Sequence, residues 1–282
     1  MNRPFRRGPL RGGHLLPALR FACRVPLALV LLIAGLALVL FAFPRLGYPR
    51  RDRIVASWSR LLLRACGVRA VELPAPGAGS LAELKGGALL LANHVNWLDI
   101  FLILSRTPAH FVAKMEISGW PVVGALVAGV GTLFVERHRR RAVSQLNDRI
   151  ENMLRLARRV AVFPEGTTSD GSRLLQFHAN LIEPALRAGV PVVPVGLRYT
   201  DRHGRPTEAV LFTGDMTLGA SLWRLLGAPG IVAELHPLPA VTGATRHEVA
   251  ERARHAMAER LALPMDDEVP ETLRKALAKA AA

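Results

Sequence analysis

The chain has 282 residues, of which 50% are hydrophobic, so it is long and apolar enough to bury a large core and is not a disordered protein. Lys and Arg outnumber Asp and Glu by 37 to 22, and the formal charge of +15 suits an anionic partner such as a phospholipid surface, a nucleic acid or an acidic carrier. Cys23 and Cys66 have no metal-ligand spacing, which argues against a disulfide scaffold and a structural zinc site.

The segment from Pro26 to Phe43 is an uncharged apolar run. As a helix it would be roughly 27 Å long, close to the thickness of the hydrocarbon core of a bilayer. We therefore expect a basic tail at residues 1–24 and membrane-anchor helices at residues 25–70. A cleaved signal peptide is the alternative, but the run is long for one and lacks a small-x-small cleavage site. Arginines flank both ends, so the helix could span the bilayer or enter one leaflet and return.

A second helix is predicted at residues 54–68. Trp58 and Leu62 share one face there, and Arg60 and Arg64 share another. Such a helix lies on the lipid surface or packs on a globular domain, and periodicity alone does not distinguish the two.

After a linker at residues 73–80, strand-like runs alternate with amphipathic helical ones, which is typical of an α/β fold. The strands are expected at residues 88–93, 110–114, 132–136, 160–164, 190–197, 209–213 and 231–235. The helices are expected at residues 140–158, 178–189 and 246–262, with a frayed one at 271–282. Pro184 would kink the second of these or delay its start, and Gly189 is placed to end it.

The stretch LANHVNWLDI at residues 91–100 places a titratable pair, His94 and Asp99, in an apolar context just after a predicted strand. If a turn and a helix follow, the carboxylate can fold back to one ring nitrogen, fix the tautomer and leave the other nitrogen free as a general base. The alternative is a histidine bound to a backbone carbonyl and an aspartate that caps a helix. No G-x-S-x-G elbow, reactive cysteine or H-E-x-x-H motif accompanies the pair, so the base would act on water or on a substrate hydroxyl.

Two further segments follow predicted strands. The stretch GTLFVERHRRR at residues 131–141 ends on a cationic cluster that begins at Arg137. The stretch VAVFPEGTTSDGS at residues 160–172 supplies Glu165, Gly166 and small hydroxyl residues, in a turn whose amides could hold an anion. Taken singly, these are equally well explained as a surface ion pair and an ordinary turn.

Taken together and in order, NHVNWLD, GTLFVER, FPEGT and VPVVPV resemble the four motifs of the glycerolipid acyltransferase family. The resemblance implies a mixed, mostly parallel sheet flanked by helices, an acyltransferase domain at residues 71–265 and a C-terminal helical tail at residues 266–282. It also implies a membrane anchor and a location on the cytoplasmic face of the inner membrane. A nucleic-acid partner is not expected, because the sequence has no zinc finger and no RNA-binding strand signature, and its arginines are dispersed rather than interleaved with aromatic residues.

The resemblance also implies the chemistry. His94 is expected to take the proton of a lysolipid hydroxyl with Asp99 as its orienting partner, and the acyl donor is acyl-CoA or acyl carrier protein, with no metal and no other cofactor. Substrate binding is expected of four residues: Arg137, Glu165, Gly166 and Thr167.

The third motif departs from many phosphatidate-forming members, which continue it with an arginine where this chain has Thr168. A lost guanidinium weakens the case for bidentate phosphate recognition. The acceptor is therefore expected to be 1-acyl-sn-glycerol-3-phosphate or, as the alternative, a lyso-ornithine lipid. A lipid hydrolase and a non-catalytic lipid-binding protein are the rival classes.

Overall fold

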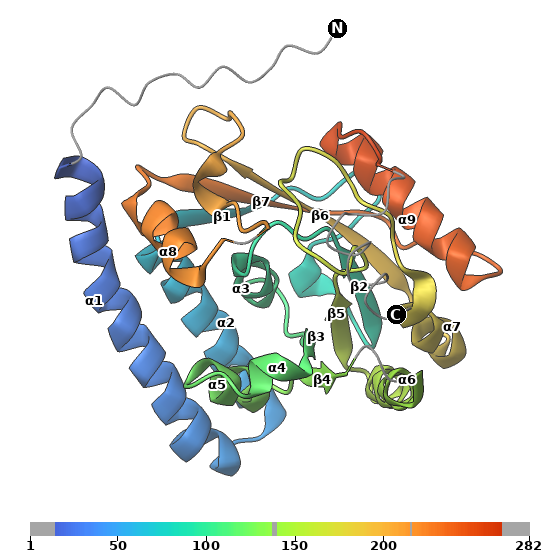
Figure 1. The fold of residues 1–282 in the computed structure, drawn as a ribbon. Coiled ribbons are helices and arrows are strands. Elements are labelled where there is room, and N and C mark those ends of the chain that lie inside the picture. The colour runs from blue at the N-terminus through green and yellow to red at the C-terminus, as the bar shows by residue number, and fades with distance from the viewer. Residues whose placement is uncertain (1–14, 137–139, 215, 267–282) are drawn as a thin grey trace, which may run out of the picture.

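A computed structural model describes residues 15–136, 140–214 and 216–266. The helix predicted at 271–282 and residues 1–14 of the predicted basic tail lie outside these ranges. The described part of the chain folds around one sheet with helices on both faces (Figure 1).

Seven strands of the described residues form the sheet in the order β1-β7-β6-β2-β5-β3-β4. They are β1 (Val68–Glu72), β2 (Ala88–Ala92), β3 (His110–Lys114), β4 (Leu133–Val135), β5 (Arg159–Val162), β6 (Val192–Thr200) and β7 (Ile231–Pro237). β6 and β7 pair antiparallel, and the other neighbouring pairs are parallel. The predicted fold class, an α/β protein with a mixed, mostly parallel sheet, is confirmed.

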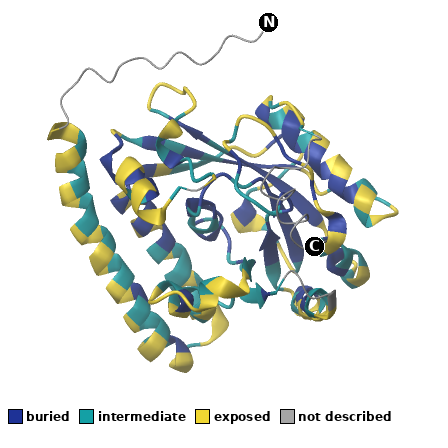
Figure 2. Ribbon diagram, in the orientation of Figure 1, coloured by how far each residue is buried: buried dark blue, intermediate teal, exposed yellow. Residues whose placement is uncertain are grey.

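Helices cover both faces of this sheet. They are α1 (Leu15–Ala37), α2 (Tyr48–Ala65), α3 (Leu98–Leu104), α4 (Met115–Ser118), α5 (Val123–Gly129), α6 (Arg140–Arg155), α7 (Glu183–Ala188), α8 (Leu218–Gly227) and α9 (Arg246–Leu261). Side chains of β2 alternate between the faces: Leu90 packs in a core with α2, α3 and α8, whereas Leu89 and Leu91 pack in a second core with α6, α7 and α9. β2 is therefore buried on both faces, as its unbroken apolar sequence requires (Figure 2).

Six of the seven predicted strands are present, but the one predicted at 209–213 is wrong. That segment forms a 3₁₀ turn at Glu208–Val210 followed by a loop, because Thr207 caps the turn by accepting the N–H of Ala209. β1 was not predicted: it lies at the edge of the sheet, and only Val68 of its five residues is buried. Its apolar signal is correspondingly weak.

The predicted helices at 140–158 and 246–262 are confirmed as α6 and α9. The helix predicted at 178–189 is shorter: a 3₁₀ turn at Ala179–Leu181 precedes α7, whose first turn contains Pro184. Proline fits there because the first turn of a helix needs no N–H at that position. Gly189 ends α7 in the left-handed conformation, as predicted.

The apolar N-terminal helix begins at Leu15, within the segment assigned to the basic tail, and continues through Pro26. With the π and 3₁₀ turns that follow α1, it forms the Leu15–Arg45 run, which is long and apolar enough to cross a membrane by length and composition. Only 6% of the residues in its most apolar window are buried within the protein, whereas a core helix would be mostly buried (Figure 2). The predicted hydrophobic segment is thus a helix with an exposed apolar surface.

The inner side of α1 lies along the body of the protein beside α8 and α2 (Figure 1). Phe21 contacts Trp223 of α8 with ring centroids 4.6 Å apart, and the indole N–H of Trp58 on α2 donates to the Leu31 carbonyl at 2.8 Å. Near its two ends, Pro17 lies against Gly227 and Val39 against Gly129. The Leu15–Arg45 run is therefore attached to the globular domain at points near both of its ends and between them.

Candidate active site

His94 lies two residues beyond β2, in the loop that connects the centre of the sheet to α3. Asn93 fixes the start of this loop, because its side-chain amide donates to the Leu197 carbonyl at 3.0 Å and accepts the Leu197 N–H at 2.7 Å. The loop thus leaves the sheet at the carboxyl end of β2, beside β6 and β5, where parallel sheets commonly open into a ligand site.

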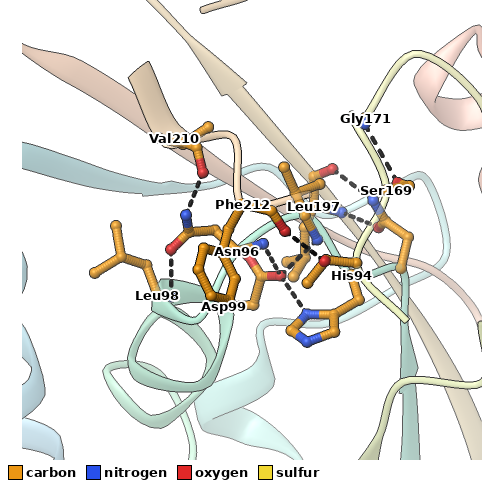
Figure 3. Close-up of polar contacts among 12 residues, drawn as sticks. His94, Asn96, Leu98, Asp99, Ser169, Gly171, Leu197, Val210 and Phe212 are labelled. Atoms are coloured by element: carbon orange, nitrogen blue, oxygen red, sulfur yellow. Dashed lines mark hydrogen bonds and ion pairs between the residues drawn. The ribbon is translucent and has the colours of Figure 1, made fainter. Parts of the chain in front are cut away.

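The histidine and the aspartate contact each other directly (Figure 3). His94 Nδ1 lies 2.8 Å from Asp99 Oδ2. The Asp99 side chain is fully buried, whereas the His94 side chain is 20% exposed. A carboxylate accepts from Nδ1–H, so the hydrogen bond leaves Nε2 as the ring nitrogen with a free lone pair. The pair has the geometry of an oriented base that a substrate can reach.

Asp99 also accepts backbone hydrogen bonds. The N–H groups of Val95 and Asn96 donate to Asp99 Oδ2 at 2.8 and 2.9 Å. The aspartate therefore holds the loop before α3 and orients the imidazole as well. It is not the helix cap of the alternative interpretation, because the N-cap of α3 is Trp97 and Asp99 lies in the first turn. The two roles coincide because the loop folds back over the first turn of α3.

Tyr199 of β6 provides the remaining contact of this carboxylate. Its hydroxyl donates to Asp99 Oδ1 at 2.5 Å, and the whole side chain is buried. Burial and the neighbouring Asp99 charge hold the pKa of Tyr199 well above its usual value, so the phenol stays protonated and remains a donor.

The third-motif segment covers the other side of the imidazole. Phe163, just past β5, stacks on His94 with ring centroids 3.9 Å apart and an interplanar angle of 13°. The N–H of Ser169 donates to the His94 carbonyl at 2.7 Å (Figure 3). These contacts fix both the ring plane and the backbone of the histidine.

Glu165 belongs to the same third-motif segment, and its side chain is 1% exposed. Burial raises the pKa of its carboxyl to about 8, against the opposing effect of the backbone N–H of His94. The group is therefore mostly neutral at pH 7. Gly166 follows with φ +72°, a left-handed conformation that glycine adopts without steric cost, and Thr167 is half-buried beside it.

Comparison with known proteins shows the family to which this chain belongs. The sequence profile of the acyltransferase family matches residues 72–198. A 1-acyl-sn-glycerol-3-phosphate acyltransferase of Neisseria meningitidis is 38% identical over 177 residues, which cover 62% of this chain and 67% of that protein. A lyso-ornithine lipid O-acyltransferase of Pseudomonas aeruginosa is also 38% identical, over 218 residues that cover 76% of this chain and 80% of that one. The chain belongs to the acyltransferase family.

A solved structure shares the fold of this acyltransferase. It is the 1-acyl-sn-glycerophosphate acyltransferase of Thermotoga maritima, which superimposes with a TM-score of 0.65 at 21% sequence identity. The match covers 88% of this chain and 95% of that one. It includes more than the segment matched by the family profile.

Of the site residues predicted for this acyltransferase, the structure places His94, Asp99 and Glu165 beside one another. Gly166 and Thr167 follow Glu165 in the same loop, and their contact with a substrate stays a prediction. Arg137 lies outside the described residues. β4 ends two residues before Arg137. It runs parallel to β3, β5 and β2, so the carboxyl ends of these four strands lie at the same edge of the sheet. The contact of Arg137 with the acceptor stays a prediction.

Sequence reasoning missed Tyr199 and the loop after Val210. The carbonyls of Val210 and Phe212 accept hydrogen bonds from the side chains of Asn96 and Thr168, so this loop ties the first motif to the third (Figure 3). The available signal was small: a tyrosine at the end of a valine-rich strand, and a short apolar segment that matches a strand equally well.

Proposed function

We propose that this acyltransferase moves a fatty acyl group from acyl-CoA or acyl carrier protein to the free hydroxyl of a lysolipid at a membrane. The observation that supports the proposal is the 2.8 Å contact between His94 Nδ1 and the buried Asp99 carboxylate, which leaves the Nε2 lone pair free on a side chain that is 20% exposed. The resemblance of the four motifs assigns the same two residues to this step.

In the proposed reaction, His94 Nε2 takes the proton of the acceptor hydroxyl while the oxygen attacks the thioester carbonyl carbon. The C–S bond breaks, and the imidazolium returns the proton to the departing thiolate. Asp99 stabilises the imidazolium, and the stacked Phe163 holds the ring plane. Because a thioester is already activated, positioning of the two substrates contributes much of the rate.

The acceptor we propose is 1-acyl-sn-glycerol-3-phosphate, with Arg137 holding its phosphate and the third-motif loop shaping the pocket. A specific observation favours the second candidate, a lyso-ornithine lipid. Thr168 stands where many phosphatidate-forming enzymes have an arginine, and its hydroxyl donates to the Phe212 carbonyl. The Thr168 hydroxyl therefore donates its hydrogen bond to the loop and not to a phosphate. Each of the two activities appears in the name of a different relative that is 38% identical to this chain.

We further propose that the outer face of α1 lies in lipid and that the catalytic domain is on the cytoplasmic face of the inner membrane. Exposed apolar side chains along that face support this placement: Leu16, Leu19, Leu27, Val30 and Ile33. Both ends of α1 pack on the domain, which favours insertion into one leaflet over a perpendicular crossing.

The test supplies a labelled acyl thioester to the detergent-solubilised protein, with and without each lysolipid. Transfer only in the presence of an acceptor supports the proposal, release of the acyl group to water indicates a hydrolase, and neither indicates a binding protein. His94→Ala should lower kcat at least about a hundredfold, the usual contribution of a general base. The matched control is His247→Ala, because His247 is an exposed histidine of α9. Retention of more than a few per cent of activity in His94→Ala would contradict the base assignment.

A further inference from the structure

A second charged site lies away from the catalytic pair, at the outer edge of β1. It is a pocket of about 340 Å³ between the last turns of α2, the segment after α3 and the edge strand. We call it the arginine pocket, and it is lined by Arg60, Leu63, Arg64, Gly67, Val68, Arg69, Ala70 and Arg106. Half of these residues are arginines and none is acidic.

Two of the arginines are held in place by backbone carbonyls. Arg106 Nη2 donates to the Ala70 carbonyl at 2.7 Å, and Arg60 Nη1 donates to the Ser105 carbonyl at 3.0 Å. The Nε–H of Arg106 is buried and has no hydrogen-bond acceptor, because the carboxylate of Glu72 is 3.9 Å away. A buried unsatisfied donor is costly, so a ligand that accepted from this N–H group would stabilise the pocket.

The side chains of the other two arginines, Arg64 and Arg69, are exposed and make no ion pair or hydrogen bond within the part of the chain that the structure describes. Arg60 and Arg64 lie one helical turn apart on α2, so their charges repel each other at close range. Glu72 offsets one of the four positive charges. The pocket therefore keeps a surplus of positive charge that an anion would neutralise.

The edge strand adds backbone donors. The N–H of Ile231 donates to the Gly67 carbonyl, and the N–H of Leu73 donates to the Leu235 carbonyl, so the odd-numbered residues of β1 face β7. By alternation, the N–H groups of Val68 and Ala70 point to the outer edge, where β1 has no neighbouring strand among the described residues.

We propose that the arginine pocket binds a phosphate-bearing anion, a phosphate or diphosphate group, as a second site separate from the catalytic centre. A doubly charged phosphate matches several guanidinium groups at once, and the planar fork of each can donate two parallel hydrogen bonds to it. Leu63 and Val68 offer an apolar wall for the remainder of the molecule. The phosphate has two possible sources: a soluble phosphate ester, or a lipid headgroup, since α2 packs against the apolar helix α1.

The first experimental arm titrates inorganic diphosphate into the full chain in detergent by calorimetry, without acyl thioester, so the result does not depend on acyl transfer. Arg64→Ala and Arg69→Ala should each weaken binding at least about tenfold, the usual effect of losing a hydrogen bond to a charged group. Arg149→Ala is the control, because Arg149 is also exposed, lies on α6 and makes no ion pair within the described residues. Each variant is checked for an unchanged unfolding midpoint.

The second arm measures flotation with vesicles of phosphatidylcholine, with and without added phosphatidate. If the ligand is a headgroup, the gain from phosphatidate falls in Arg64→Ala and Arg69→Ala but not in Arg149→Ala, and free diphosphate is bound weakly by all. If the ligand is soluble, the calorimetric arm alone separates the variants. Equal behaviour of all three variants in both arms would overturn the proposal.

Discussion

The most tightly held side chain of the site is Asp99, which accepts from His94, Tyr199 and two backbone N–H groups. A fully buried carboxylate needs such partners, because an ion without them would lose its solvation uncompensated. Oδ2 takes three of the four contacts, and Oδ1 takes the tyrosine. The phenol therefore fixes the rotation of the carboxylate that in turn fixes the imidazole.

We expect Tyr199→Phe to lower kcat about tenfold while the KM for both substrates changes little. The reason is that a hydrogen bond to a charged group contributes about 1.5–3 kcal/mol, and this one positions the pair without contacting substrate. Steady-state kinetics measure the split between kcat and KM. Tyr48→Phe is the matched control, because Tyr48 is the other tyrosine of the chain and is exposed. An unchanged kcat in Tyr199→Phe would show that the other three contacts suffice.

The raised pKa of Glu165 makes the stability of the protein depend on pH. Its folded pKa of about 8 lies above the ordinary 4.5, so between these values the native protein holds a proton that the unfolded chain has released. The free energy of unfolding should therefore fall by about 1.4 kcal/mol for each unit that the pH rises through this window. Below about 4.5 both states are protonated and above about 8 both are ionised, so the slope disappears outside it.

Glu165→Gln removes this proton exchange. We expect the variant to gain stability over the wild type progressively from about pH 4.5 to 8, as measured by urea unfolding at a series of pH values. Glu259→Gln, at an exposed position of α9, is the control and should follow the wild type. A difference between Glu165→Gln and wild type that does not grow with pH would contradict the raised pKa.

At the scale of elements, the sequence predicted what is local. His94 and Asp99 are five residues apart, so one turn brings them together, and β2, the strand that precedes them, is apolar throughout. Tyr199 is 100 residues from Asp99 and meets it only because β6 pairs with β2 in one register. No local pattern encodes that pairing, so the tyrosine could not be found.

Other elements were missed because their pattern is short or ambiguous. α3 has seven residues, Leu98–Leu104, and its sequence LDIFLIL is apolar nearly all round, so it shows no helical stripe. The wrong strand at 209–213 and the missed β1 have related causes: one is a short apolar segment in a loop, and the other an edge strand with a single buried residue. Periodicity identifies the face that an element buries, and these elements provide little of it.

The contact of α1 with α2 depends on a small residue. Gly35 is buried against Trp58, and a Cβ at that position would lie 3.0 Å from the indole. We expect Gly35→Leu to lower the free energy of unfolding by about 1–3 kcal/mol, because the added atoms overpack the contact. Thermal unfolding in detergent measures the change. Ala34→Leu adds bulk one residue away on the exposed face and should have little effect, so equal losses in the two variants would contradict this packing.

At the scale of the whole molecule, the apolar surface lies on one side and the catalytic pair at the edge of the sheet. The exposed side chains of α1 are joined by Trp223 on α8, which packs against Phe21, and by Trp120 between α4 and α5, so the apolar surface extends beyond the first helix. Tryptophans concentrate where protein meets the lipid headgroups. In the proposed placement of α1, this wider surface would face the lipid as well.

The two cysteines allow this orientation to be measured. Cys23 lies on the exposed face of α1, whereas Cys66 is buried, and burial raises the pKa of its thiol to about 11. Because the thiolate is the reactive form, Cys66 should stay unmodified and Cys23 should report alone. We expect a water-soluble maleimide to react slowly with Cys23 in phospholipid vesicles, since lipid covers that face.

The comparison variant combines Cys23→Ser with Glu259→Cys, which places a thiol on α9, far from α1 (Figure 1). It should react rapidly in the same vesicles, and Cys23→Ser alone should not react. Mass spectrometry at timed intervals gives the rates. If Cys23 reacts as fast as the thiol on α9, the outer face of α1 is in water, and acyl transfer at a lipid surface would require a different contact with the membrane.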